Sequence, residues 1–160
     1  MIVTQQPAAG DMRSIVAAMS VIVDLERMGD QAKGIAKVVP HLLKNPTQER
    51  PHELKTMGHV VGRMLDDALL AYASNDVVLA REVAGRDDEV DALYSRVFNK
   101  ALQQMAVSGT TERAESAYEI LRVARELERF GDLATNVAER IIYLVTGARV
   151  EINVDEPASA

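Results

Sequence analysis

The chain has 160 residues, of which 48% are hydrophobic, 26% are charged and only 4% are aromatic, as expected for one globular domain with an aliphatic core. Its formal net charge of −6 argues against a nucleic-acid-binding protein, which needs a basic surface to neutralise phosphates. The absence of cysteine excludes disulfides, thiolate catalysis and cysteine-bound metal centres.

Helical periodicity predicts an all-α protein, and the first helix is expected from Asp11 to about Leu43. Two prolines, Pro46 and Pro51, then break the chain. One stripe of this helix mixes apolar and charged side chains, and it consists of Ile15, Met19, Ile22, Glu26, Asp30 and Lys33. We expect the apolar part of this face to dock onto the rest of the chain or onto a second copy.

Three further helices are predicted after the break. They span residues 52–73, 76–107 and 111–146. Ser74 or Asn75 is expected to cap the second of these, and Gly147 to end the last. The residues after 148 read as a short polar tail.

A sequence of fourteen residues occurs twice, 102 positions apart. Residues 24–37 and 126–139 are identical at seven positions, and both contain Glu-Arg-x-Gly-Asp. A duplicated motif of this length indicates a duplicated structural unit.

Three acidic pairs have the spacing that places side chains above one another on a helix. They are Glu26 with Asp30, Asp87 with Asp91, and Glu128 with Asp132. Such carboxylates need a cationic partner when they are shielded from water. A hard metal cation bound by several oxygens is one solution, and a nearby arginine such as Arg27 or Arg129 is the other. The spacing alone leaves both open.

Other functional motifs are absent from the sequence. There is no glycine-rich phosphate loop, no nucleophile elbow and no zincin motif. No apolar run is long enough to span a bilayer, and the N-terminus does not read as a signal peptide. We therefore expect a non-enzymatic, cytoplasmic protein without direct membrane insertion.

The chain resembles the PhoU family of phosphate-signalling proteins. The resemblance rests on residues 6–13, on both copies of the repeated motif and on Asp87-Asp-Glu-Val-Asp91. It implies two tandem three-helix bundles with metal-binding carboxylate motifs. The implied metal ligands are Glu26, Asp30, Asp87, Asp91, Glu128 and Asp132, and the implied ions are iron, zinc, manganese or magnesium.

The resemblance also implies a domain organisation. Residues 1–45 would form the last helix of a truncated first unit, 46–51 a linker, 52–147 a complete three-helix bundle and 148–160 a tail. The fold expected is thus a PhoU-like helical bundle with one complete three-helix unit plus one extra long helix.

The resemblance implies a regulatory adaptor that couples the ATPase subunit of a phosphate ABC transporter to a sensor histidine kinase. It would act as a negative regulator of the phosphate-starvation response, and we expect a homo-oligomer, specifically a dimer. Two alternatives remain from the residues themselves. One is a metal-carboxylate enzyme such as a phosphohydrolase or an oxidase, and the other is a purely structural helical dimerisation module.

Overall fold

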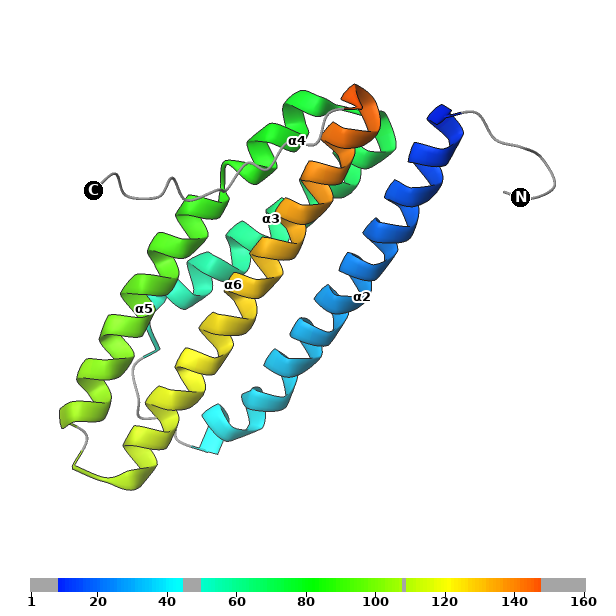
Figure 1. The fold of residues 1–160 in the computed structure, drawn as a ribbon. Coiled ribbons are helices and arrows are strands. Elements are labelled where there is room, and N and C mark those ends of the chain that lie inside the picture. The colour runs from blue at the N-terminus through cyan, green and yellow to red at the C-terminus, as the bar shows by residue number, and fades with distance from the viewer. Residues whose placement is uncertain (1–8, 45–49, 108, 148–160) are drawn as a thin grey trace, which may run out of the picture.

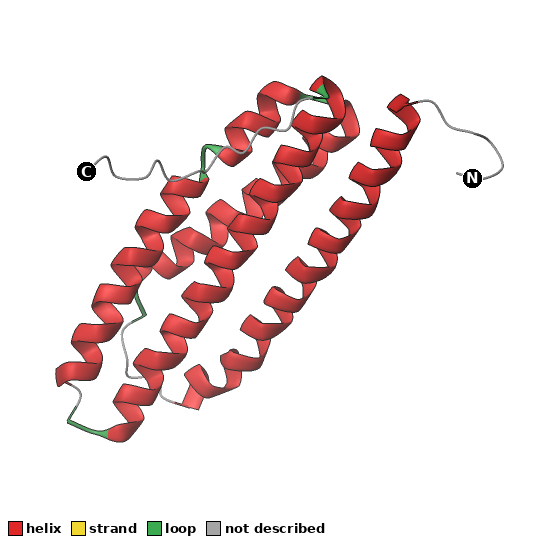
Figure 2. Ribbon diagram, viewed as in Figure 1, coloured by secondary structure: helices red, strands yellow, loops and turns green. Residues whose placement is uncertain are grey.

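The computed structural model describes residues 9–44, 50–107 and 109–147, and every regular element in these ranges is an α-helix (Figures 1 and 2). In chain order the helices are α2 (Ala9–Lys44), α3 (His52–Ser74), α4 (Val77–Ala84), α5 (Asp87–Val107) and α6 (Thr111–Thr146). The predicted all-α fold is confirmed. The proposed linker residues 46–49 and the polar tail lie outside the described residues.

Helix α6 is the centre of the bundle, because α2, α3, α4 and α5 all pack against it. Helix α2 lies alongside α6 and runs in the opposite direction (Figure 1). The buried positions of α6 are mostly small or β-branched, which allows several helices to approach it closely. They include Ala117, Ile120, Ala124, Ala134, Val137, Ala138, Ile141 and Ile142.

Of the two dockings expected for the apolar part of this stripe, the one onto the rest of the chain is wrong, and docking onto a second copy stays a prediction. Met19 and Ile22 are 63% and 64% exposed, and Glu26 and Asp30 also face solvent. The positions of α2 that are buried form a neighbouring stripe, and they are Ala17, Val21, Asp24, Met28 and Val38. The helix carries two apolar stripes, and the second is the one that packs on α6.

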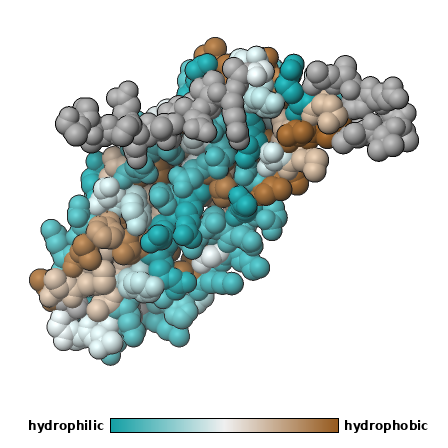
Figure 3. All heavy atoms as spheres, viewed as in Figure 1, coloured by the Kyte–Doolittle hydropathy of each residue, from teal (hydrophilic) through white to brown (hydrophobic). Residues whose placement is uncertain are grey.

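An apolar surface therefore remains on α2, which we call the outer apolar face. It consists of Val16, Met19, Ile22 and Val23, whose exposed fractions range from 48% to 64%. Figure 3 shows brown, apolar atoms along the first half of α2, and a second apolar area at the lower left of the same view.

The single helix predicted over residues 76–107 is in fact two. Helix α4 ends at Gly85, and the Arg86 amide bonds to the carbonyl of Val83 instead of continuing the α-helical pattern. Glycine disfavours a helix interior, and an ion pair between Arg86 and Asp67 of α3 holds the chain at this bend. As a result, α5 starts at Asp87 with its own N-terminal turn.

The cap of α4 also differs from the prediction. Asn75 adopts the left-handed conformation that ends α3, with φ of 54°. Asp76 is the N-cap, and its Oδ1 accepts hydrogen bonds from the amides of Val78 and Leu79 at 2.9 and 3.0 Å. None of the helices in the described ranges has the length and apolarity needed to cross a membrane.

Candidate functional site

Four of the six predicted site residues lie on two adjacent helices. Asp87 and Asp91 occupy the first two turns of α5, and Glu128 and Asp132 lie one turn apart on α6. Helices α5 and α6 pack against each other. The bend at Gly85 and Arg86 matters here, because it places Asp87 at a helix start, where a negative charge is favoured by the helix dipole.

The carboxylates of α5 and α6 act on one another electrostatically. Burial raises the pKa of Glu128, and the negative charges of Asp91 and Asp87 raise it further. Burial is also the main reason why the pKa of Asp132 rises to about 6, and Glu128 and Asp91 add to the effect. Arg129 lowers both pKa values without cancelling the rise. The structure thus brings the two pairs into one negatively charged group.

Asp87 is the most deeply placed member of this group. Only 9% of its surface is exposed, and its Oδ1 accepts a hydrogen bond from the hydroxyl of the buried Thr135 at 3.3 Å. Thr135 lies one turn beyond Asp132 on α6, so its hydroxyl fixes the position of the α5 carboxylate relative to α6. This contact ties the two halves of the group together.

Gly131 explains how the helices approach so closely between Glu128 and Asp132. A Cβ atom at this position would lie 3.4 Å from Val90 Cγ1 and 3.7 Å from Val61 Cγ1. The equivalent glycine of the first motif, Gly29, has no atom within 4 Å of such a Cβ. Close helix packing at the motif glycine is therefore found in the second motif and not in the first.

The donor chemistry of the α5–α6 group suits a hard cation, because all four side chains offer carboxylate oxygens and repel one another. The arrangement is not a preformed coordination site. Within the residues that the structure describes, no three His, Cys, Asp or Glu side chains are placed to hold a metal ion. Binding would have to draw these side chains together.

Glu26 and Asp30, the remaining predicted ligands, lie on the exposed side of α2. Their motif is the repeat of Glu128 and Asp132, but no helix of the described chain covers it in the way that α5 covers α6. The structure therefore leaves this pair apart from the other four.

One buried charge was not singled out from the sequence. Asp24 is only 2% exposed, and its Oδ2 accepts a hydrogen bond from Arg140 Nε at 3.0 Å. Its counterpart in the second motif, Glu126, lies against α2, since a Cβ at Gly34 would be 3.2 Å from its Cδ. Both motifs begin with an acidic residue, and this shared acid is the signal that could have marked the α2–α6 contact.

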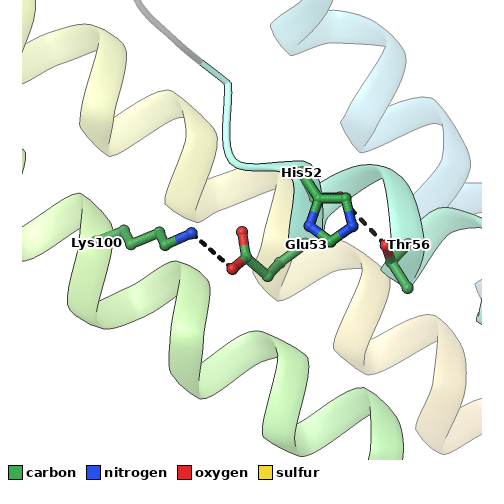
Figure 4. A network of polar contacts seen from close by, with 4 residues as sticks. All are labelled: His52, Glu53, Thr56 and Lys100. Atoms are coloured by element: carbon green, nitrogen blue, oxygen red, sulfur yellow. Dashed lines mark hydrogen bonds and ion pairs between the residues drawn. The ribbon is translucent and has the colours of Figure 1, made fainter.

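A second polar network lies at the start of α3 (Figure 4). Lys100 of α5 donates a hydrogen bond to Glu53 Oε1 at 2.6 Å, and this bond is the main cause that lowers the pKa of Glu53. Thr56 donates to the backbone carbonyl of His52 at 3.3 Å, which is a contact within the first turn of the helix. The network links α3 to α5 and gives His52 no role as a ligand.

The raised pKa of Asp132 predicts a specific pH dependence. The carboxyl group of Asp132 has a pKa of about 6 in the folded chain, against an ordinary value of 3.8. The folded chain therefore binds this proton more tightly than the unfolded chain does. The resulting stabilisation is fully present below about pH 4 and is lost as the pH rises above 6. Asp132→Asn should remove this part of the slope and be more stable than the parent at pH 7. Because Asp132 is exposed as a residue, the gain should stay below about 1 kcal/mol.

Urea unfolding of both proteins between pH 4 and 8, in the presence of a chelator, measures this difference. Asp66→Asn, an exposed aspartate on α3, is the matched control. Parallel stability curves for the parent and Asp132→Asn would show that folding does not raise the pKa of Asp132.

A family model described as "PhoU domain" matches residues 1–39 and 54–141 of the chain. The phosphate-specific transport system accessory protein PhoU homolog of Clostridium acetobutylicum is 40% identical over 154 residues, which cover 96% of this chain and 69% of that protein. The homolog of the same description from Zymomonas mobilis is 40% identical over 145 residues, or 90% of this chain and 60% of that protein. The chain thus spans 60% and 69% of the length of these two relatives.

Two solved structures share the fold. The phosphate transport system regulatory protein PhoU from Streptococcus pneumoniae superposes with a TM-score of 0.82 at 32% identity, over 91% of this chain and 68% of that one. PhoU from Pseudomonas aeruginosa superposes with a TM-score of 0.84 at 35% identity, over 92% of this chain and 70% of that one. At these identities the likeness extends to the sequence as well as to the helical arrangement.

Proposed function

This chain belongs to the PhoU family, and on that premise we propose that it is a regulatory adaptor of phosphate uptake and of the phosphate-starvation response. The observation that carries the proposal is the match of the PhoU domain model to residues 1–39 and 54–141, which contain both copies of the repeated motif. The relatives' description as accessory proteins of a phosphate-specific transport system supports it.

We further propose that the adaptor works by protein contact and not by catalysis. Its partners would be the ATPase subunit of a phosphate ABC transporter and a sensor histidine kinase, both reached from the cytoplasm. Long exposed helices such as α2 offer surfaces for such contacts, and α2 carries an apolar face that the described helices do not cover.

A pull-down from membranes that contain the phosphate transporter and the kinase tests this proposal. The tagged chain is expected to retain the ATPase subunit, and an unrelated acidic helical bundle serves as the control. Failure to retain either partner, with and without added metal ions, would overturn the partner assignment while leaving the family membership intact.

The carboxylates are proposed to take a divalent or trivalent metal ion. Asp87, Asp91, Glu128 and Asp132 would hold it. The burial and the mutual repulsion that raise the pKa values of Glu128 and Asp132 support this assignment. A bound cation would neutralise the group and fix α5 relative to α6. The exposed pair Glu26 and Asp30 is proposed as a second, weaker site.

A homodimer through the outer apolar face is the expected oligomer. The positions of α6 that correspond to Met19 and Ile22 are Leu121 and Ala124, and Ala124 is fully buried. The equivalent face is thus covered on α6 and open on α2. A second copy of the chain can cover the open face of α2 in a self-complementary contact.

The double substitution Met19→Gln/Ile22→Gln is therefore expected to convert a dimer into a monomer in light scattering coupled to size exclusion. Val78→Gln, at an exposed apolar position of α4, is the matched control and should leave the dimer intact. A monomeric parent, or a double variant that remains dimeric, would contradict the assignment of this face.

A further inference from the structure

A hollow of about 290 Å³ lies between α2 and α6. It is lined by Arg27, Gln31, Arg129, Asp132, Leu133 and Asn136. Two arginines and two side-chain amides thus surround one carboxylate. The lining is unusual for a chain with a net charge of −6, because it concentrates positive charge in one place.

The two arginines are the same residue of the repeated motif, 102 positions apart. Helices α2 and α6 run in opposite directions (Figure 1), and each contributes one of these arginines to the lining of the hollow. The acidic residues that begin the two motifs are related in the same way, since Asp24 of α2 contacts α6 and Glu126 of α6 contacts α2. The repeat thus places one arginine on each of the two helices that line the hollow.

Both arginines are exposed, and neither takes part in an ion pair or hydrogen bond among the described residues. Arg129 acts on Asp132 and Glu128 only through its field. Other arginines of the bundle are used as structural partners, as Arg86 is for Asp67 and Arg140 is for Asp24. The guanidinium donors of Arg27 and Arg129 are available for a ligand.

We propose that this hollow binds a small multivalent oxyanion between Arg27 and Arg129. A guanidinium group presents parallel N–H donors that match two oxygens of a tetrahedral anion, and two such groups can hold one anion from opposite sides. The amides of Gln31 and Asn136 can donate to the remaining oxygens. The hollow is open to water, so binding is expected to be weak and rapidly reversible.

The site goes beyond the adaptor function, and it does not depend on it. The negative charge of Asp132 repels an anion in this hollow. Substitutions of Asp132 and of the arginines should therefore change the affinity for the anion in opposite directions. Removing that carboxylate should strengthen anion binding, whereas removing either arginine should weaken it. A cation bound to the carboxylates of α5 and α6 could interfere, so the measurement is made with a chelator present.

The experiment is a titration of the full chain with inorganic phosphate, followed by the NMR shifts of the α2 and α6 amides at constant ionic strength. The parent should saturate, Arg27→Gln and Arg129→Gln should each weaken binding about tenfold, and Asp132→Asn should tighten it. Arg122→Gln removes one positive charge elsewhere on α6, where Arg122 pairs with Glu119, and should leave the affinity unchanged.

Sulfate should compete with phosphate, and chloride at matched ionic strength should not, because the proposed recognition is of a multivalent oxyanion. If Arg122→Gln weakens phosphate binding as much as the other two arginine variants do, or if the NMR shifts never saturate, phosphate acts only by screening charge. Either result would overturn the proposal. Unchanged thermal midpoints of the arginine variants will confirm that lost binding is not lost folding. Absence of phosphate binding would leave the pull-down result unaffected.

Discussion

Arg140→Ala is expected to lower the free energy of unfolding by about 3 kcal/mol, as is typical when a buried ion pair loses one partner. Asp24 is only 2% exposed, and Arg140 Nε donates to its Oδ2 at 3.0 Å. Without the arginine, a carboxylate stays buried between α2 and α6 with no cation beside it. Because 37% of the Arg140 side chain is exposed, the loss should fall at the lower end of the usual range.

Substitution of the other partner, Asp24→Ala, should lower the free energy of unfolding by less. The partly exposed guanidinium of Arg140 can be hydrated when Asp24 is lost. Arg122→Ala is the control for a surface pair, and its loss should be at most about 1 kcal/mol. Urea unfolding at pH 7 measures all three. A loss in Arg140→Ala no larger than that in Arg122→Ala would show that the pair does not hold α2 to α6.

Much of the fold could be predicted because helices leave local signals. The prolines before α3 and Gly147 after α6 mark helix ends. The bend between α4 and α5 was missed, since one glycine within a long periodic segment is also compatible with a continuous helix. The ion pair that fixes the bend joins residues 67 and 86, which no local pattern connects.

The face that α2 buries could not be predicted in the same way. Its sequence supports two apolar stripes, one with Met19 and Ile22 and one with Val21 and Met28. Periodicity identifies both, but only the shape and charge of α6 decide between them. The pairing of Asp24 with Arg140, 116 residues apart, favours the stripe that is buried.

The candidate site was predictable in part. The four-residue spacing of Glu128 and Asp132 places both on one turn of α6, and the same holds for Asp87 and Asp91 on α5. That these two pairs act on one another depends on helix packing, which Gly131 permits by leaving room for Val90. The spacing also suggested Glu26 and Asp30, because it carries no information on which copy of the motif is covered by another helix.

A metal ion that binds the α5–α6 carboxylates is expected to raise the thermal midpoint of the chain. A ligand at one hundred times its dissociation constant stabilises the folded state by about 2.7 kcal/mol, which corresponds to a rise of about 5–10 °C for a chain of this size. The gain has a physical source in the repulsion among Asp91, Glu128 and Asp132, which a cation would remove. Since the side chains must first be drawn together, the ion should be needed in excess.

Differential scanning calorimetry with manganese, magnesium, zinc or ferrous iron, against a chelated sample, measures the rise. Asp87→Asn/Asp132→Asn should abolish it, because the double variant removes one ligand from each helix and half of the charge in the group. Glu26→Gln/Asp30→Asn removes the same number of charges from the exposed motif of α2 and should retain most of the rise. If all four ions leave the parent unchanged, or if both double variants respond alike, the carboxylates of α5 and α6 are not a metal site, and Arg125 and Arg129 remain the cations that act on Glu128.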